Sequence, residues 1–428
     1  MSMTQRMDYA RIGETLYSYE SRNGLKVLVV PKPGYARKYA NYATNFGSVD
    51  NYYELEGEPE AVLLPDGIAH FLEHKLFEGE QEDVMHRFAR MGASPNAYTS
   101  FSKTVYLFSC TRNFEDSLKL LLDFVQHPNM TEESVEKEKG IIQQEIDMYV
   151  DNPGWSIYFG LLKGLYADHP VRIEIAGSRE SLARINRDLL YKCHANFYNP
   201  LNMMMVAVGD FDPDMIFRIV EEGIDPAIKP VHVKKISRPF LPGVAEPLVR
   251  RKMKVSAPMF MLGFKEIPSA QEGIEFLRTE IAMDLILDLL AGRSTPFHEE
   301  LYSRGLINDT FEYEYTAERD FAFTLFGSES PRPEEAADRI IQELERVRRQ
   351  GFDEAAFDRV RKSAFGQFLR SFNSVDSIAR NLLHTGFNQA GLLDYAEIYD
   401  TISLDFLYKT MSSRFQPGNF TVSLAEPV

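Results

Sequence analysis

Residues 65–79 read PDGIAHFLEHKLFEG, a segment with the pattern of a single buried helix. No helix breaker interrupts the segment after Asp66, which we expect to cap the helix N-terminus. Apolar residues lie on nearly every side, which indicates a buried helix. On such a helix His70 and His74 lie one turn apart on one face, with Glu73 beside them.

This arrangement predicts a metal site. Two imidazoles at positions i and i+4 can bind one ion, and zinc accepts such ligands while keeping a position open for water. The carboxylate of Glu73 can then take a proton from that water. The order His-x-x-Glu-His is the inverted form of the His-Glu-x-x-His motif of zinc proteases. The alternative is a surface helix with chance polar residues, but buried His and Glu side chains need partners.

Composition indicates a soluble globular protein of more than one domain. The chain has 428 residues, of which 44% are hydrophobic and 26% charged. Its net charge of -16 argues against nucleic-acid binding, which needs a basic surface. A charge of this sign favours a mildly cationic substrate over an acidic one.

Cysteine usage and the absence of apolar segments bear on the compartment. The two cysteines, Cys110 and Cys193, exclude a disulfide scaffold and a cysteine-rich zinc site. Residues 1–13 lack the apolar core of a signal peptide, and no 18-residue apolar span occurs. We therefore expect a cytoplasmic protein without a membrane partner.

The chain divides at a proline-rich stretch. Five prolines lie between residues 223 and 247, which predicts a linker at 229–247 between domains 1–228 and 248–428. In both halves strands are followed by helices and then by a strand. This pattern predicts an α+β fold of two similar domains, each a mostly antiparallel sheet flanked by helices.

Two further segments are candidates for the site. Residues 92–107 start with small residues and a proline, which suits an edge strand. Near a metal, such a strand can pair with an extended peptide, although a plain sheet edge is the alternative. Residues 131–150 predict a long charged helix, on which Glu138 and Glu145 share a face. Glu145 is a candidate third ligand, because a two-histidine site commonly takes a carboxylate from a second helix.

These motifs together resemble the insulinase/pitrilysin family of zinc peptidases, in its half-length branch with mitochondrial processing peptidase and bacterial relatives. The resemblance covers the first half of the chain and, more faintly, the second. It is carried by His70–His74, Asn96–Thr99, Glu138–Glu145, Asn152-Pro153, His169-Pro170 with Gly177, residues 198–203, and Gly209-Asp210.

The resemblance implies a role for each matching residue. One Zn²⁺ per chain is expected on His70, His74 and Glu145, with Glu73 as the general base. Glu138 occupies the supporting position and is the alternative third ligand. The strand of Asn96, Ala97, Tyr98 and Thr99 corresponds to the edge strand that takes up the substrate backbone. The two domains are expected to form half of a clamshell.

One departure from the family pattern concerns the partner. Active members carry an Arg and a Tyr seven residues apart in a segment that matches residues 300–308 here. Leu301 and Asn308 occupy these two positions. Leu has no cationic donor, and Asn has no phenol to stabilise an oxyanion. We therefore expect a heterodimer in which a paralogous subunit supplies the pair.

The prediction from sequence is a zinc metalloendopeptidase subunit. It would hydrolyse short or unfolded peptides within a two-subunit chamber, as the metal-bearing partner. The alternative is a non-catalytic assembly or peptide-binding subunit of a processing complex. The complete His70-Glu73-His74 set favours the enzyme.

Overall fold

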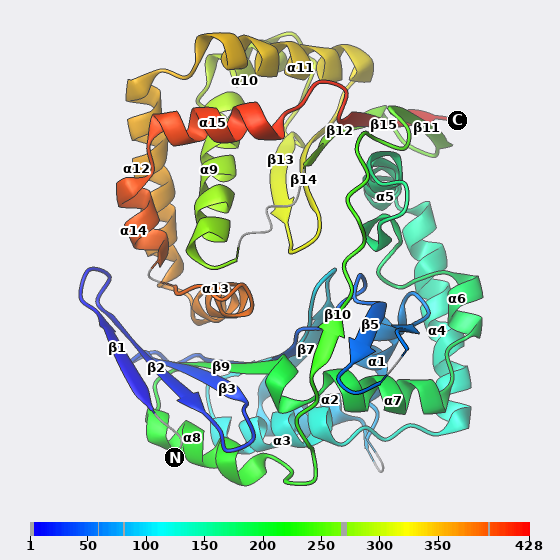
Figure 1. The fold of residues 1–428 in the computed structure, drawn as a ribbon, viewed down its shortest axis with the longest axis vertical. Coiled ribbons are helices and arrows are strands. Elements are labelled where there is room, and N and C mark those ends of the chain that lie inside the picture. Colours follow the sequence, from blue (N-terminus) through cyan, green and yellow to red (C-terminus); the bar gives the residue numbers. More distant parts are fainter. Residues whose placement is uncertain (1–3, 59, 80–81, 267–271, 393) are drawn as a thin grey trace. The chain divides into compact units, whose positions relative to one another are not determined.

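The computed structural model describes residues 4–58, 60–79, 82–266, 272–392 and 394–428. It confirms the predicted α+β class, with two large mixed sheets flanked by helices (Figure 1). The chain falls into two compact units. Unit 1 consists of Met1–Ile146, Glu174–Ser237 and Leu369–Phe387, and unit 2 of Asp147–Ile173, Arg238–Phe368 and Asn388–Val428. The sequence-based division at 229–247 stays a prediction.

Unit 1 contains most of the elements from the first half of the chain. In chain order these are β1 (Gln5–Tyr9), β2 (Glu14–Glu20), β3 (Lys26–Pro31), β4 (Lys38–Thr44), β5 (Tyr52–Leu55), β6 (Val62–Leu63), α1 (Ile68–Leu76), α2 (Val84–Met91), β7 (Ala93–Thr99), β8 (Thr104–Cys110), α3 (Phe114–Gln126), α4 (Glu132–Asp151, which runs on into unit 2), α6 (Arg179–Ala183), α7 (Arg187–Phe197), η2 (Pro200–Asn202), β9 (Met203–Gly209), α8 (Pro213–Gly223), β10 (Val233–Lys235) and α13 (Val375–Phe387).

The main sheet of unit 1 has the strand order β1-β2-β3-β9-β4-β8-β7 among the described residues. Of the strand pairs that the structure describes in this sheet, only β3–β9 is parallel. Every residue of the central strand β9 is buried, which fits its unbroken apolar sequence. β7 lies at one edge of this sheet, beside β8. A smaller sheet has the order β10-β5-β6.

Unit 2 contains the remaining elements. In chain order these are α5 (Pro153–Leu165), η1 (Pro170–Arg172), β11 (Leu248–Met253), β12 (Met259–Glu266), α9 (Ile274–Ala291), α10 (Pro296–Ser303), β13 (Glu312–Ala317), β14 (Ala322–Glu329), α11 (Pro333–Gln350), α12 (Glu354–Ser371, whose last residues belong to unit 1), α14 (Asp394–Thr401), α15 (Leu404–Arg414) and β15 (Phe420–Pro427).

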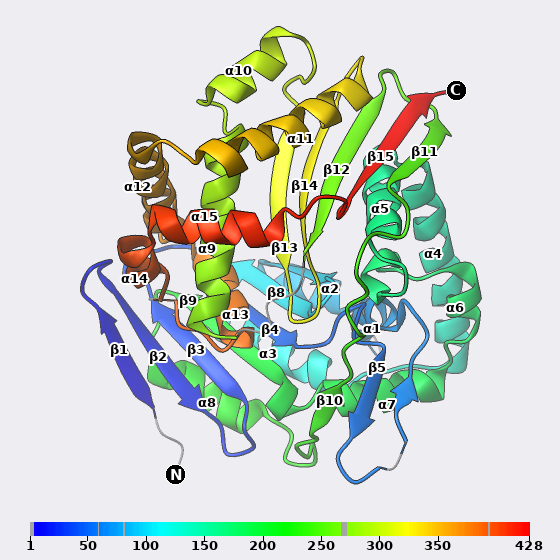
Figure 2. The ribbon, with the colours of Figure 1, turned by 45° about the horizontal axis from the view of Figure 1, so that its top comes forward.

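The sheet of unit 2 has the order β11-β15-β12-β14-β13, again with one parallel pair, β11–β15, among the described strands (Figure 2). Its core is built on α9, whose buried residues include Leu277, Ile281 and Leu285. α11 and α15 add further buried apolar side chains to the same core. The sheet is therefore stabilised by a continuous apolar layer on its helical side.

Each sheet is covered in part by a helix from the other half of the sequence. α5 contacts β15, β12 and β11, and α13 contacts β9 and β4. Two glycines let α5 approach the sheet: a Cβ on Gly160 would lie 2.6 Å from Ser423 Oγ, and one on Gly164 would lie 2.4 Å from Thr421 Cγ2. Larger residues at these positions would force the helix away from the strand.

No helix within the described ranges combines the length and the apolar character that crossing a membrane requires.

Candidate metal centre

Helix α1 carries the first residues of the site, and a glycine sets where it begins. Gly67 precedes the helix with φ 86°, and a Cβ there would lie 2.4 Å from the Ala176 carbonyl oxygen. Only glycine fits this left-handed conformation and close approach. The expected cap at Asp66 is wrong, because its Oδ1 accepts a hydrogen bond from Asn51 Nδ2 at 2.8 Å and no side chain caps the helix.

His70, His74 and Glu145 come together from α1 and α4. Their ligand atoms all lie within 4.8 Å of one another, and among the described residues they form a group that could hold a metal ion. His70 Nε2 lies 3.6 Å from Glu145 Oε1, and His74 Nε2 lies 3.5 Å from Glu145 Oε2. The two imidazole rings are 4.5 Å apart between centroids.

These separations fit a zinc ion. Ligands about 2.0–2.1 Å from a tetrahedral zinc lie roughly 3.3 Å from one another. The two Nε2-to-carboxylate distances of 3.5 and 3.6 Å are close to that value. The donor set of two imidazoles and one carboxylate is also the one that catalytic zinc sites use with a fourth position open. The three residues therefore match zinc in both chemistry and spacing.

Glu138 lies behind His74, on the far side of its ring. Its Oε1 accepts a hydrogen bond from His74 Nδ1 at 2.9 Å, which leaves Nε2 directed at Glu145. Burial lowers the pKa of His74, but the hydrogen bond to Glu138 and the nearby carboxylates outweigh it, so that the pKa is raised. A carboxylate on the outer nitrogen of a ligand histidine fixes its tautomer and orientation.

His70 is in a different electrostatic environment. Burial, with the charge of His74 as a second cause, lowers the pKa of His70 to about 4. Its imidazole is therefore neutral at physiological pH, which is the form that binds a metal. Its Nδ1 is buried without a hydrogen-bond partner in the described part of the chain.

Glu73 points to the edge of the sheet. Its Oε2 accepts a hydrogen bond from the Thr99 hydroxyl at 2.7 Å. Burial raises the pKa of Glu73, and the hydrogen bond from Thr99 works in the opposite direction. A carboxylate of raised pKa is a better proton acceptor near neutral pH. The sequence predicted both residues at the site but not the contact between them, which depends on how α1 packs on β7.

The predicted edge strand is present as β7. Among the described strands of its sheet it pairs only with β8, from Ala93–Cys110 to Thr99–Thr104. Asn96 is exposed, and its Oδ1 accepts a hydrogen bond from the backbone N–H of Ala97 at 2.9 Å. Tyr98 and Thr99 are half-buried. The strand thus ends beside Glu73, and the edge of β7 that faces away from β8 pairs with no other described strand of this sheet.

One residue near the site escaped the sequence interpretation. Lys75 is completely buried on α1, where its Nζ donates to Ser134 Oγ at 2.9 Å and forms an ion pair with Glu78. The signal was a lysine in a helix whose other residues, apart from His70, Glu73 and His74, are apolar. The hydrogen bond to Ser134 ties the end of α1 to the start of α4, the two elements that supply the candidate metal ligands.

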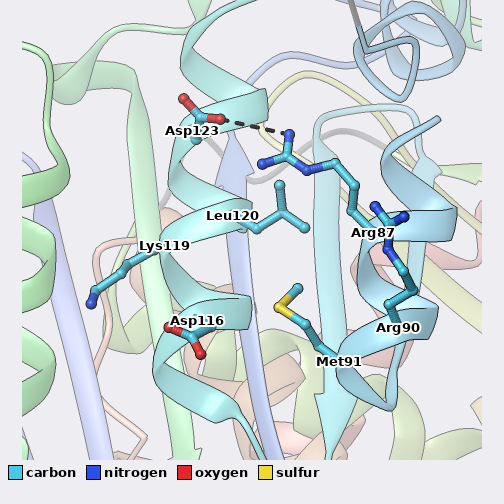
Figure 3. Close-up of a pocket in the computed structure, with 7 residues that line it drawn as sticks. All are labelled: Arg87, Arg90, Met91, Asp116, Lys119, Leu120 and Asp123. Carbon is cyan, nitrogen blue, oxygen red and sulfur yellow. Dashed lines mark ion pairs between the residues drawn. The ribbon is translucent and has the colours of Figure 1, made fainter. Parts of the chain in front are cut away.

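A surface hollow between α2 and α3 lies outside this centre (Figure 3). An ion pair of 3.9 Å between Arg87 and Asp123 bridges the two helices there. None of the predicted site residues lines the hollow. Its lining residues are Arg87, Arg90, Met91, Asp116, Lys119, Leu120 and Asp123.

Fold and metal centre together define the class of a zinc-dependent peptidase with an inverted helix motif. Residues 64–179 match the family model described as insulinase, peptidase family M16, and residues 184–364 match the one described as the peptidase M16 inactive domain. The zinc protease YmfH of Bacillus subtilis is 40% identical over 99% of this chain and 100% of its own length. The chain therefore belongs to peptidase family M16, and is a zinc protease.

Solved structures agree with this assignment. An M16-like peptidase from Alicyclobacillus acidocaldarius superposes with a TM-score of 0.94 at 36% identity, over 97% of this chain and 99% of the other. Pitrilysin gives a TM-score of 0.76 at 16% identity, over 100% of this chain but 46% of its own. At that identity the match to pitrilysin shows the fold alone. The predicted resemblance to the half-length branch is confirmed.

Proposed function

We propose that this chain is the metal-bearing subunit of an endopeptidase that hydrolyses short or unfolded peptides. The observation that carries the proposal is the convergence of His70, His74 and Glu145, with Glu73 between this cluster and the edge strand β7. We assign one zinc ion per chain to the three ligands, and Glu138 to the position that orients His74.

The residues of the chain supply proton transfer and positioning. A zinc ion held by the three ligands supplies a Lewis acid and a water molecule acidified to a pKa of about 7. Glu73 accepts the proton of the attacking water on its carboxylate and returns it to the leaving amine. Thr99 holds the Glu73 carboxylate through the 2.7 Å hydrogen bond, so that the base faces the end of β7.

Strand β7 supplies the binding surface for the substrate. An extended peptide can add to its outer edge through main-chain hydrogen bonds, with the scissile bond near Thr99. Residues Asn96, Ala97, Tyr98 and Thr99 form this surface. An edge that pairs through backbone groups accepts many sequences, which suits a peptidase acting on short or unfolded peptides.

A paralogous subunit completes the site in our proposal. Leu301 is buried in the core of unit 2 and offers no polar group. The Nδ2 of Asn308 donates to Glu329 Oε2 at 3.0 Å, and its Oδ1 accepts from the Thr310 N–H at 2.9 Å. The Leu301 side chain has no donor, and the Asn308 amide is bonded to the Glu329 carboxylate. We therefore assign the Arg/Tyr pair to a second subunit and the reaction to a chamber formed by both. The buried free thiols Cys110 and Cys193 support a reducing, cytoplasmic setting.

The role of Glu73 is tested with Glu73→Gln. The variant should bind zinc stoichiometrically, by elemental analysis, but cleave a quenched fluorescent peptide about 10²–10⁴-fold more slowly. A variant that holds zinc and cleaves as fast as the wild type contradicts the proposal. A wild-type chain purified without zinc would favour the non-catalytic alternative.

The need for a partner is tested separately. The isolated chain should cleave peptides weakly, and addition of a similar-sized paralogue that carries the Arg/Tyr pair should raise kcat strongly. The paralogue with its Arg changed to Ala is the matched control and should give no gain. High activity of the purified chain without any second subunit contradicts the heterodimer but leaves the peptidase proposal intact.

A further inference from the structure

Helix α13 belongs to the same unit as the metal centre, although it lies more than two hundred residues further along the chain. It crosses one face of the main sheet over β9 and β4 (Figure 1). A Cβ on Gly386 of α13 would lie 2.6 Å from the Cε atom of Met204. The side chain of Met204 therefore marks the face that α13 covers.

The strand register extends this face to the edge strand. Met204 pairs with Ala43, Ala43 with Val105, and Val105 with Tyr98. Directly paired residues in a sheet point to the same face, and neighbours along a strand point to opposite faces. Tyr98 thus faces the α13 side, whereas Thr99, bonded to Glu73, faces the side of the metal centre.

Arg380 is the arginine of α13, and α13 lies on the same face of the sheet as Tyr98. It is exposed, and it lies one turn after Asp376, the usual position for a helical ion pair. Asp376 is instead bonded to Arg37, whose Nη2 donates to it at 2.8 Å. The Nη2 of Arg380 donates to Ser377 Oγ at 3.4 Å, and no carboxylate among the described residues lies within ion-pairing distance of Arg380.

The charge of Arg380 acts on tyrosines of two strands. Burial raises the pKa of Tyr98 on β7, and the positive charge of Arg380 opposes that effect. Tyr39 on β4 is affected by Arg380 in the same direction, again against a larger effect of burial. Tyr39 lies four residues before Ala43 on β4, so it points to the same face as Ala43 and Tyr98. Both phenols therefore lie on the face of the sheet that α13 covers.

We propose that Arg380 is a specificity-determining residue, which selects peptides with a carboxylate side chain on the residue that faces the α13 side beside Tyr98. The inference rests on the proposed function, in which an extended peptide pairs with β7. Side chains of such a peptide alternate between the two faces, so every second one points toward Arg380. The guanidinium fork matches a carboxylate, and the Tyr98 hydroxyl can add a hydrogen bond.

The proposal runs against the charge of the chain as a whole. A net charge of -16 favours cationic peptides in general. Arg380 acts on one position of the peptide, whereas carboxylates elsewhere on the chain are screened by salt beyond a Debye length of about 8–10 Å. The expected substrate is therefore a peptide of mixed charge, with an acidic residue at one fixed distance from the scissile bond.

The test uses the full chain loaded with zinc and carrying Glu73→Gln, so that peptides bind without being cleaved. Ten-residue fluorescent peptides carry Glu, Gln or Lys at each position in turn, and anisotropy gives the Kd. At one position Glu should bind about three- to fivefold more tightly than Gln, the strength of an exposed ion pair. Arg380→Met should abolish this ratio, and Arg380→Glu should make Lys the preferred residue there.

Arg218→Met is the matched control. Arg218 is an exposed arginine on α8, in the helical layer beneath the sheet in Figure 1, and its loss should leave every Glu-to-Gln ratio unchanged. If peptides bind but Arg380→Met keeps the wild-type ratio, the inference is wrong and the proposed function stands. If no peptide binds to any variant, peptide binding at β7 is refuted, and the role of Arg380 with it.

Discussion

The two units are built alike but differ in chemistry. The order β3-β9-β4-β8-β7 in unit 1 has its counterpart in β11-β15-β12-β14-β13 in unit 2. Both series begin with a parallel pair and continue with antiparallel pairs. Each sheet receives one covering helix from the other half of the sequence, α13 in unit 1 and α5 in unit 2. The scaffold alone therefore does not distinguish the unit that carries the metal centre.

Both units also hold a glutamate bonded to a threonine, half-buried in unit 1 and buried in unit 2. In unit 1 Thr99 donates to Glu73 at 2.7 Å, and in unit 2 Thr324 donates to Glu266 at 2.6 Å. Burial raises the pKa of both, that of Glu266 to about 7. Among the described residues, only Glu73 has a His-His-Glu group beside it. The difference indicates that a perturbed carboxylate is a candidate catalytic group because of its neighbours rather than because of its own pKa.

The largest expected effect is on metal binding. His74→Ala should weaken zinc binding by about 10³-fold or more. This exceeds the roughly 10–100-fold loss that is typical when a residue hydrogen-bonded to a metal ligand is removed. Asp288→Asn, which keeps an acceptor for the Tyr313 hydroxyl in unit 2, should leave zinc affinity unchanged. Competition with a chromophoric chelator measures both. Loss of zinc in Asp288→Asn would contradict the assignment of zinc binding to unit 1 alone.

The second effect concerns stability and pH. The folded-state pKa of Glu266, about 7, lies above the ordinary value of 4.5. Folding therefore favours the protonated acid, and its contribution, complete below pH 4.5, is lost as pH rises to 7. The loss should be about 3 kcal/mol. Glu266→Gln should remove it, whereas the exposed Glu314→Gln should not.

Trp155 makes this effect measurable in unit 2 alone. It is the single tryptophan of the chain and lies on α5. Urea unfolding followed by its fluorescence, between pH 4.5 and 8, reports on the unit that contains Glu266. A wild-type transition that does not depend on pH over this range would contradict the assignment.

A smaller effect is expected at Glu138. Glu138→Gln removes the charge that accepts the His74 Nδ1 hydrogen bond, and zinc affinity should fall by about 10–100-fold. Glu136→Gln is the control on the same helix, because Glu136 is exposed and paired with Lys139. The chelator competition assay serves again. A loss as large as that of His74→Ala would make Glu138 a ligand instead of an orienting residue.

The smallest effect concerns Thr99. Thr99→Val removes a hydrogen bond that lowers the pKa of Glu73, so that this pKa should rise further. The acidic limb of kcat/KM should then move to higher pH, with a loss of roughly three- to tenfold near neutrality. Thr99→Ser should restore the wild-type profile. A uniform loss at every pH would indicate a merely structural role for the threonine.

Sequence alone predicted the parts of the site that depend on local spacing. His70 and His74 needed only the helical period, and the edge character of β7 needed only its small residues and Pro95. Glu145 was predicted as the third ligand from its position on a second helix and from the family resemblance. The bond between Thr99 and Glu73, and the burial of Lys75 against Ser134, depend on how elements distant in sequence pack. Local spacing carries no information about such contacts.

The fold shows the same limit. Alternation of strands and helices predicted the α+β class. It did not predict that α13 packs on β9 or that α5 packs on β15, because chain order favours neighbours in sequence. The cap at Asp66 failed for a related reason: Asn51, from a different segment, competes for its carboxylate.

Because α13 lies late in the sequence but packs on the sheet of unit 1, this sheet cannot be completed until most of the chain has been synthesised. The main sheet of unit 1 has all its strands once Gly209 has been made, but residues 375–387, which cover its Met204 face, follow much later. At 5–20 residues per second this interval is on the order of ten to thirty seconds. During this interval the apolar face of β9 that α13 later covers is exposed on the nascent chain. We therefore expect the sheet of unit 1 to complete its packing late in synthesis, because of the place of one helix in the sequence.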